Sequence, residues 1–243
     1  MPLKEPGSTL RALLSAASRH PSRPLLLPGI PIPILAQSAH KIGFNGVYIS
    51  GGATSASLSL PDIGVASKTD FVRLISQIHA VSSLPILADA DTGMIDSAHN
   101  SQLITSTVFD YISAGAAGFH IEDQVFPKRC GHLTGKSLKP VDEFVQTIKY
   151  AREAVLDPVR SRDNEFVIVA RTDARSVDGL EAVVERSRAY LDAGADMIFP
   201  EGLQSETEFR YVASQLSQSH PGVYLLANMT EFGQSPSIAA STL

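Results

Sequence analysis

The chain has 243 residues, of which 44% are hydrophobic and 19% charged, and a formal net charge of −5. This size and composition predict one soluble domain with a large core. The acidic balance argues against nucleic acid or an anionic membrane as a partner, and no apolar run reaches the roughly 18 residues of a membrane span.

The N-terminal segment from Leu10 to Ala17 is apolar and is flanked by Arg11 and Arg19. We interpret it as an amphipathic helix capped by Ser8 or Thr9. A weak transit peptide is the alternative, which would place the protein in mitochondria. One cysteine cannot form an internal disulfide, so a reducing compartment and a cytoplasmic location are favoured.

Short apolar runs alternate with segments of helical period along the rest of the chain. Each run is almost continuously apolar, as a strand buried on both faces of a parallel sheet should be. The predicted strands are Leu25–Leu27, Gly46–Ile49, Pro85–Ala88, Gly118–Ile121, Phe166–Ala170, Met197–Phe199 and Val223–Ala227. The predicted helices are Pro33–Ile42, Thr69–Ser82, Ser101–Ala114, Val141–Leu156, Gly179–Ala193 and Glu206–Ser217.

Alternating strands and helices form either a closed (β/α) barrel or an open doubly wound sheet. No Gly-x-Gly-x-x-Gly turn follows the first predicted strand, which argues against a dinucleotide-binding sheet. Polar residues follow nearly every predicted strand, as they do around the active face of a barrel. We therefore predict an α/β fold of the TIM-barrel type, with residues 1–243 in a single domain.

Carboxylates follow two neighbouring predicted strands. Asp89 and Asp91 follow one strand, and Glu122 follows the next. Mg²⁺ prefers a few carboxylates together with water and substrate oxygens, so the pattern predicts a magnesium site. The alternative is that one aspartate caps the next helix or pairs with a lysine.

Three further groups of polar residues follow predicted strands. Arg171 could grip a carboxylate of a substrate, or could form a structural ion pair with Asp173 or Glu201, and the residues alone do not decide. The glycine turn Ser50-Gly51-Gly52 offers backbone N–H groups to an anionic oxygen, although glycine pairs also form ordinary turns. Asn228 and Thr230 could donate to a second carboxylate.

The only cysteine lies in the run Lys128-Arg129-Cys130-Gly131-His132. A single cysteine is usually a small buried apolar residue, but such cysteines lie among Val, Leu and Ala. Here neighbouring cations favour the thiolate, and the glycine lets the backbone approach a ligand closely. The setting therefore predicts a functional thiol.

These motifs together resemble the isocitrate lyase and phosphoenolpyruvate mutase superfamily, and within it the branch of 2-methylisocitrate lyases. The resemblance covers about Leu10 to Pro236, in the superfamily's order. It is carried by Ser50 to Gly52, Leu60 to Asp62, Asp89 to Gly93, Ile121 to Gln124, Pro127 to Leu133, Ala170 to Ala174, Phe199 to Gly202 and Leu226 to Gly233. The cysteine run is the most specific of these motifs.

The resemblance implies a Mg²⁺-dependent lyase, with Mn²⁺ as an alternative metal, that splits 2-methylisocitrate into pyruvate and succinate. It implies that Asp89 and Asp91 hold the metal with Glu122 and Asp62 in support, and that Cys130 acts as general acid. The implied catalytic residues are Cys130, Arg171, Glu122 and His132. The implied substrate contacts are Ser50, Gly51, Gly52, Gly131, Glu201, Asn228 and Thr230. The implied partners are a small carboxylate substrate and further copies of the chain.

The superfamily's barrel continues after its seventh strand with an eighth strand and with helices that pack on a partner subunit. This chain stops soon after its seventh predicted strand. We therefore expect an incomplete, seven-stranded barrel and a weakened oligomer. The alternatives are an oxaloacetate hydrolase or phosphonate-type enzyme of the same superfamily, and a non-catalytic truncated chain that pairs with a full-length homologue.

Overall fold

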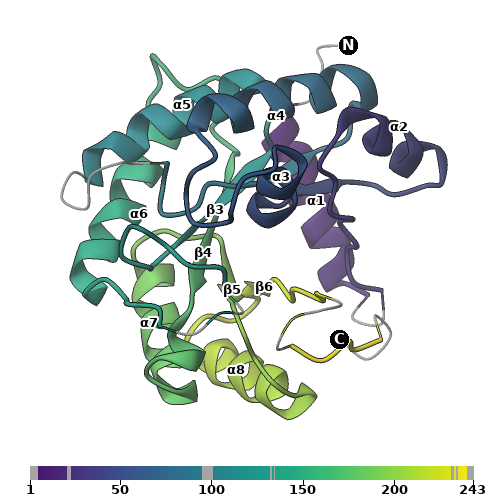
Figure 1. Cartoon of the computed structure of the whole chain (residues 1–243). Helices are drawn as coiled ribbons and strands as arrows, with labels where there is room; N and C mark the ends of the chain where they lie inside the picture. The colour runs from purple at the N-terminus through teal and green to yellow at the C-terminus, as the bar shows by residue number, and fades with distance from the viewer. Residues whose placement is uncertain are drawn as a thin grey trace.

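Six parallel strands form one sheet in chain order, and the sheet curls so that helices cover its outer side (Figure 1). The computed structural model describes residues 5–20, 23–94, 101–131, 133, 135–230, 233 and 235–239. The strands are β1 (Val47–Ile49), β2 (Ile86–Asp89), β3 (Gly118–Glu122), β4 (Val167–Thr172), β5 (Met197–Pro200) and β6 (Tyr224–Leu225). The register places Asp89 beside His120 and Glu122 beside Arg171.

The helices follow one another around the sheet, as expected for repeated βα units. They are α1 (Pro6–Ser18), α2 (Pro33–Lys41), α3 (Gly51–Ser57), α4 (Lys68–Ser82), α5 (Ile104–Ala114), α6 (Val141–Val155), α7 (Leu180–Asp192) and α8 (Glu206–Ser219), with short 3₁₀ turns η1 (Ser101–Leu103) and η2 (Ala174–Ser176). Within the described ranges, no helix is both long and apolar enough to cross a membrane.

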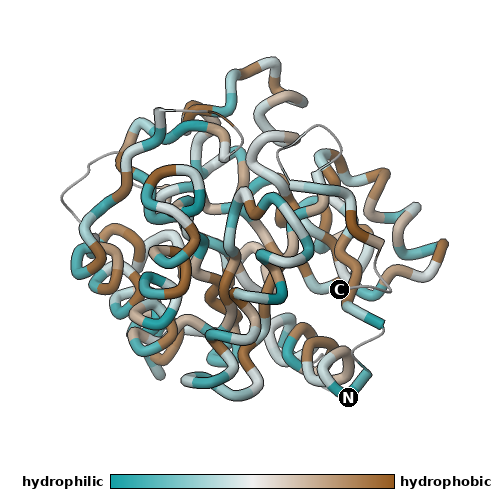
Figure 2. The backbone as a smooth tube through the Cα atoms, turned by 90° about the horizontal axis from the view of Figure 1, so that it is seen from below, coloured by the Kyte–Doolittle hydropathy of each residue, from teal (hydrophilic) through white to brown (hydrophobic). Residues whose placement is uncertain are grey.

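Two hydrophobic clusters lie on the two faces of the sheet. Ile168 and Ala170 of β4 face the outer helices, whereas Val167 and Val169 face the inner side, because successive strand residues point to opposite faces. Figure 2 shows hydrophobic stretches toward the interior of the fold and hydrophilic ones mostly at its periphery. This burial on both faces explains why the predicted strands are apolar without alternation.

Helix α1 packs on the inner side of the sheet, where Leu10 and Leu14 join the inner cluster. The N–H of Gly7 donates to Asp163 at 2.6 Å, which ties the start of the helix to the segment before β4. A Cβ atom at Gly7 would lie 2.5 Å from the backbone carbon of Glu165, so only glycine permits this approach. Ser8 and Thr9 lie inside the first turn and Glu5 is the N-cap, so the predicted cap was wrong.

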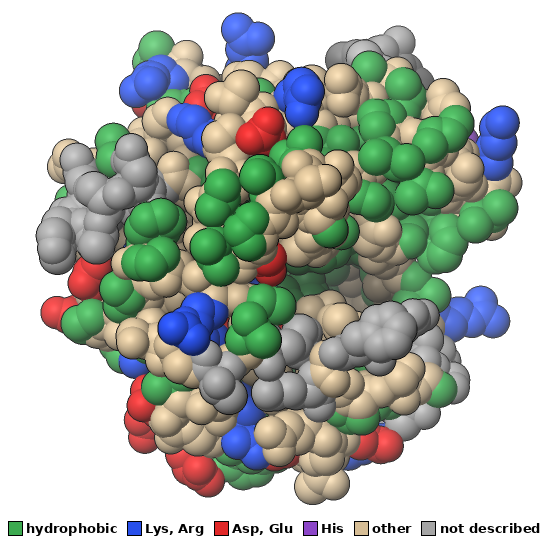
Figure 3. All heavy atoms as spheres, viewed as in Figure 1, with side chains coloured by type: hydrophobic (Ala, Val, Ile, Leu, Met, Phe, Trp, Pro, Cys, Tyr) green, Lys and Arg blue, Asp and Glu red, His purple; other side chains and the backbone are tan. Residues whose placement is uncertain are grey.

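The barrel is incomplete in a different way from the one predicted. Six strands form the sheet rather than seven, because the segment at 25–27 forms no strand. Next to it, Gly29 makes an isolated parallel bridge to Tyr48 of β1. The carbonyl of Pro28 accepts from the N–H of Tyr48 at 2.9 Å and the N–H of Ile30 donates to the carbonyl of Tyr48 at 2.8 Å, so the pairing with β1 lies after the predicted segment. The space-filling view is hollowed near the middle of the region that the curled sheet surrounds (Figure 3).

Candidate active site

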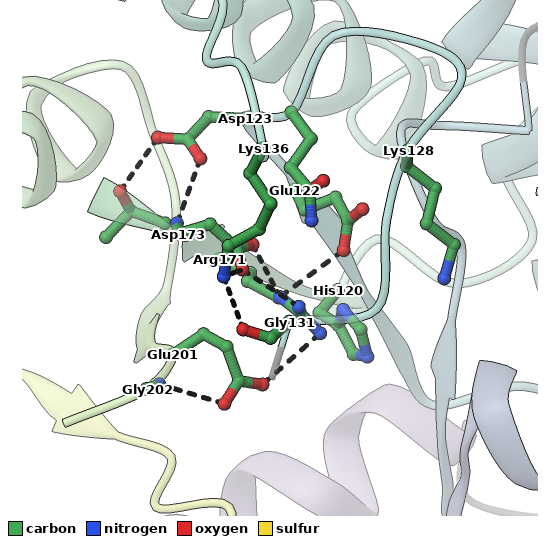
Figure 4. Close-up of polar contacts among 12 residues, drawn as sticks. His120, Glu122, Asp123, Lys128, Gly131, Lys136, Arg171, Asp173, Glu201 and Gly202 are labelled. Carbon is green, nitrogen blue, oxygen red and sulfur yellow. Dashed lines mark hydrogen bonds and ion pairs between the residues drawn. The ribbon is translucent and has the colours of Figure 1, made fainter. Parts of the chain in front are cut away.

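The carboxyl ends of the strands bring polar side chains to one rim of the sheet, because all six strands run in parallel. β2 ends at Asp89, β3 ends at Glu122, and Glu201 follows β5 directly. Figure 4 shows side chains from β3, β4 and the segment after β5 directed toward one another. The predicted convergence of these residues on one rim is therefore observed.

Asp89 is held by hydrogen bonds at both carboxylate oxygens. Its Oδ2 accepts from the N–H of Gly51 at 2.8 Å, and its Oδ1 accepts from the N–H of Asp91 at 2.8 Å. Asp91 has a φ of 45°, which turns the chain sharply after the strand and folds the two aspartates together. A side chain at Gly51 would collide with Asp89, so this glycine is needed for the close approach.

Lys128 places an ammonium group among the acids. Its Nζ contacts Asp62 and lies 2.7 Å from Oδ1 of Asp91, and the side chain is buried. The alternative that an aspartate pairs with a lysine is therefore present in this structure. Burial lowers the pKa of Lys128, but attraction to Glu122, Asp91, Asp89 and Asp62 raises it well above its ordinary value. The lysine therefore stays charged.

Burial and neighbouring charges shift the pKa values of the acids at the rim in different directions. Burial and the neighbouring Asp89 raise the pKa of Asp91 to about 6, and burial raises the pKa of Glu122 well above its ordinary value. Burial would also raise the pKa of Asp89, but attraction to His120, Lys128 and Arg171 lowers it. Burial lowers the pKa of His120 to about 4, so this histidine is neutral at pH 7. At neutral pH, Lys128 and Arg171 therefore lower the pKa of Asp89.

The donor chemistry of the rim fits a divalent cation. Among the described residues, Oε1 of Glu122 is buried with no hydrogen-bond donor, Oε2 of Glu122 has only the ion pair with Nε of Arg171 at 3.3 Å, and Oδ1 of Asp91 has only the ammonium of Lys128 at 2.7 Å. Buried acceptors without donors are rare unless an ion or water satisfies them, and oxygen ligands suit Mg²⁺. In the described part of the chain, no three acidic, histidine or cysteine side chains already have metal-binding spacing. Lys128 lies between two of the carboxylates instead.

A cavity of about 420 Å³ lies beside this rim. It is lined by Asp91, Met94 and Phe126, and by residues at the start of α4 that include Ser67 and Lys68. Its volume falls within the range of small-molecule pockets. The cavity therefore offers space next to the acidic residues.

Arg171 forms ion pairs with three acids. Its Nε lies 3.0 Å from Asp173 and 3.3 Å from Glu122, and its Nη1 lies 3.4 Å from Glu201. Burial would raise the pKa of Asp173, but attraction to Arg171 and Lys136 lowers it to about 2. Both predicted structural ion pairs are therefore formed, at the rim where a substrate carboxylate would also meet the guanidinium.

The cysteine loop packs directly on this arginine. Cys130 is partly exposed, and Gly131 is buried. A Cβ atom at Gly131 would lie 2.3 Å from Nη2 of Arg171 and 2.6 Å from Cγ of Glu201. His132 lies outside the described residues. The loop that carries the thiol is therefore brought to the arginine, as the sequence predicted.

The remaining predicted substrate contacts have different places. Ser50 caps α3 by accepting from the N–H of Ala53, so the expected open glycine turn is the start of a helix. Asn228 donates to Oε2 of Glu201 at 3.3 Å. Thr230 lies beyond β6, where its carbonyl accepts from the N–H of Gly233. Asn228 therefore joins the site through Glu201.

The sequence pattern did not identify several residues of the site. Tyr48 and His120 face the inner side of the sheet and share a hydrogen bond of 2.6 Å, and His120 lies 3.5 Å from Asp89. In the sequence, the only sign that these two residues belong to a site is that each places a polar atom inside an apolar strand. Lys136 donates to the carbonyl of Gly131 and to Asp173, and nothing in its sequence context indicates these contacts.

The chain is similar in sequence to proteins of known family. The family model described as "Phosphoenolpyruvate phosphomutase" matches residues 16–240. The chain is 46% identical over 217 residues to a "Probable 2-methylisocitrate lyase 1" of Corynebacterium glutamicum, covering 89% of this chain and 67% of the relative. It is 42% identical over 237 residues to 2-methylisocitrate lyase of Escherichia coli K12, covering 97% of this chain and 74% of the relative.

Solved structures agree with the sequence comparison. A crystal structure of 2,3-dimethylmalate lyase, described as a PEP mutase/isocitrate lyase superfamily member, has a TM-score of 0.86 at 36% identity, covering 99% of this chain and 75% of that one. Phosphonopyruvate hydrolase in complex with oxalate and Mg²⁺ has a TM-score of 0.72 at 26% identity, covering 92% and 80%. With a family model matched from residue 16 to residue 240, this chain belongs to the phosphoenolpyruvate phosphomutase family.

Proposed function

We propose that the chain is a Mg²⁺-dependent carbon–carbon lyase that splits 2-methylisocitrate into pyruvate and succinate. The observation that carries this proposal is the packing of the Cys130 loop on Arg171, beside the acids that end β2 and β3. An acid for carbon, a cation for a carboxylate and oxygen ligands for a metal are the groups that such a cleavage requires.

Asp89 and Asp91 would hold the metal, with Glu122 and Asp62 in support. When bound, Mg²⁺ would supply positive charge beside the enolate oxygens that develop during cleavage. Mn²⁺ prefers similar oxygen ligands and is the alternative. The proposal is supported by the buried Oε1 of Glu122, which has no hydrogen-bond donor among the described residues, and by Oδ1 of Asp91, which already attracts a cation, the ammonium of Lys128.

The cleavage balances without water or a redox partner. The substrate hydroxyl loses its proton, the bond between the hydroxyl-bearing carbon and its neighbour breaks, and the hydroxyl oxygen becomes the keto oxygen of pyruvate. The released electron pair stays on the carbon that becomes succinate, and the Cys130 thiol donates a proton to it. Glu122 is our candidate for the base, because its carboxylate ends β3 at the rim, where Oε2 lies 3.3 Å from Nε of Arg171.

Arg171 would bind a carboxylate of the substrate through its planar guanidinium. Its present partners Asp173 and Glu201 would hold the guanidinium in position, and Asn228 would orient Glu201. Gly131 permits this because any side chain at that position would occupy the space above Arg171. His132 and Thr230 complete the proposed set, together with the backbone of Ser50 to Gly52.

Location and assembly are further parts of the proposal. The single cysteine supports a reducing, cytoplasmic location. A homo-oligomer is the assembly that the family resemblance implies.

The direct test is to incubate the purified chain with 2-methylisocitrate and Mg²⁺ and to measure pyruvate and succinate. We expect equal amounts of the two products, and a loss of rate of about a hundredfold or more for Cys130→Ala, since general acid catalysis is typically worth that much. Leu133→Ala is the matched control, because Leu133 is exposed in the same loop.

Two results would contradict the proposal. One is the absence of pyruvate from protein that melts cooperatively in the presence of Mg²⁺. The other is an unchanged rate for Cys130→Ala. Release of oxalate from oxaloacetate, or of phosphate from a phosphonate, would instead assign the chain to another activity of the same family.

A further inference from the structure

The thiol lies at the tip of a loop whose base is closed. Gln124 and Leu138 form an antiparallel bridge, the N–H of Val125 donates to Ser137 at 2.8 Å, and the N–H of Lys139 donates to Asp123 at 2.8 Å. These bonds fix the two ends of the loop. They do not hold the tip of the loop, which carries Cys130, at the rim.

Buried side chains hold the backbone on both sides of the thiol. On one side, the amide of Gln124 accepts from the N–H of Arg129 and donates to its carbonyl, both at 2.9 Å. On the other side, Nζ of Lys136 donates to the carbonyl of Gly131. Cys130 lies between these two contacts. Its position therefore depends on both.

Lys136 also connects the loop to the arginine. Its Nζ lies 2.8 Å from Oδ1 of Asp173, and its side chain is 1% exposed. Asp173 in turn accepts from Nε of Arg171 at 3.0 Å and from Nη2 at 3.2 Å. Figure 4 shows Lys136 reaching from the loop to Gly131, beside Arg171 and Asp173. One ammonium group thus joins the thiol loop to the carboxylate partner of Arg171.

We propose that Lys136 is a positioning residue that fixes the Cys130 thiol relative to the guanidinium of Arg171. Its part in a reaction rests on the proposed lyase function, but the positioning itself does not. The simpler alternative is that Lys136 only neutralises the buried charge of Asp173. Arg171 already gives Asp173 two hydrogen bonds, however, and the additional bond of Lys136 goes to the loop.

Hydrogen exchange of the loop tests this inference without any substrate. The N–H of Leu133 donates to the carbonyl of Cys130 and reports on the loop tip, whereas α4 reports on the rest of the fold. We expect Lys136→Met to speed exchange of the peptide at 129–135 by roughly tenfold to a hundredfold, because a charge-assisted bond is lost. Exchange in α4 should stay unchanged.

Two variants serve as comparisons. Lys149→Met removes an exposed lysine of α6 and should leave exchange in the loop at the wild-type rate. Lys136→Arg keeps a charged donor and should bring exchange closer to wild type than Lys136→Met does. Alkylation of Cys130, the only cysteine in the sequence, should be fastest in Lys136→Met, slower in Lys136→Arg, and slowest in the wild type and Lys149→Met. The rate is measured above the pH at which the thiol ionises, so that it reports access to the thiol.

The inference is overturned if Lys136→Met folds and its loop exchanges at the wild-type rate, or if exchange rises equally throughout the chain. Should Lys136→Met not melt cooperatively, Lys136→Gln replaces it. If neither variant folds, the lysine serves folding and the inference fails. Faster loop exchange together with no pyruvate from the wild type would leave the positioning role standing and remove the proposed substrate.

Discussion

At the scale of single residues, the site depends on close backbone approaches that only glycine allows. Gly51 lies against Asp89, and Gly131 lies against Arg171 and Glu201. Neither glycine needs a left-handed φ, so the constraint is space rather than backbone conformation. Both positions were predicted from the sequence as substrate contacts. The contacts between these glycines and other side chains of the site came from the structure.

We expect Gly131→Ala to reduce the proposed lyase activity by about a hundredfold, since a displacement of about 1 Å at a catalytic group can cost that much. The new Cβ would lie 2.3 Å from Nη2 of Arg171, so the loop or the arginine must move. Steady-state kinetics and thermal melting would measure the effect. Gly29→Ala is the control, because its Cβ would meet Tyr48 at an ordinary 4.0 Å. Equal activity in both variants would show that the loop tolerates the displacement.

His120 makes stability depend on pH. Burial holds its pKa at about 4 in the folded chain, below the ordinary value near 6.5, so unfolding takes up a proton between these values. The stabilising contribution is full above pH about 6.5 and is lost as the pH falls toward about 4, by about 3 kcal/mol in total.

Urea unfolding of wild type and His120→Gln between pH 7.5 and 4.5 would measure this contribution as a difference in slope. His40→Gln, at an exposed histidine of α2, is the matched control. A wild-type slope in His120→Gln would show that other groups cause the pH dependence.

At the scale of elements, the strands and outer helices follow from hydrophobic pattern, and their ends follow from local signals. The capping box of Ser67 and Asp70 begins α4, and Gly115 ends α5 in a left-handed conformation. Helix α3 was missed because Gly51 and Gly52 are typical of turns. The predicted strand at 25–27 was wrong because the chain pairs with β1 only after this segment, through Pro28 and Ile30, and the apolar pattern could not show where the pairing begins.

Helix α1 contributes to stability through its inner face. Leu10 is 2% exposed in the inner cluster, and we expect Leu10→Ala to lower the free energy of unfolding by about 2–5 kcal/mol, because truncation leaves a cavity. Chemical denaturation measures this loss. Leu26→Ala should cost far less, since Leu26 is 51% exposed. Similar losses for the two variants would mean that α1 does not depend on this packing.

At the scale of the whole molecule, the proposed metal site predicts that a divalent cation stabilises the fold. Asp91 follows β2 and Glu122 ends β3, so an ion bound by both carboxylates would link the two strands. A ligand that binds only the folded state stabilises it by about 2.7 kcal/mol at a hundred times its dissociation constant.

We therefore expect Mg²⁺ to raise the melting temperature of the wild type, and to raise it less at pH 5.5 than at pH 8. Protons compete with the metal at Asp91, whose pKa is about 6 in the metal-free chain. Asp91→Asn should lose most of the shift. Asp110→Asn, at a surface carboxylate that pairs with Lys68, should keep it. An equal shift in both variants would place the metal elsewhere.

The sequence by itself predicted the six strands that form the sheet and the helices between them except α3, and the family resemblance implied that acids, an arginine and a thiol belong to one site. It could do so because apolar runs predict buried parallel strands, and parallel strands bring their carboxyl ends to one edge. Only the tertiary structure decided that Lys128 lies among the acids and that Lys136 joins Gly131 to Asp173. Such contacts depend on how loops fold over the sheet, and no local pattern encodes which distant partner a long, flexible side chain reaches.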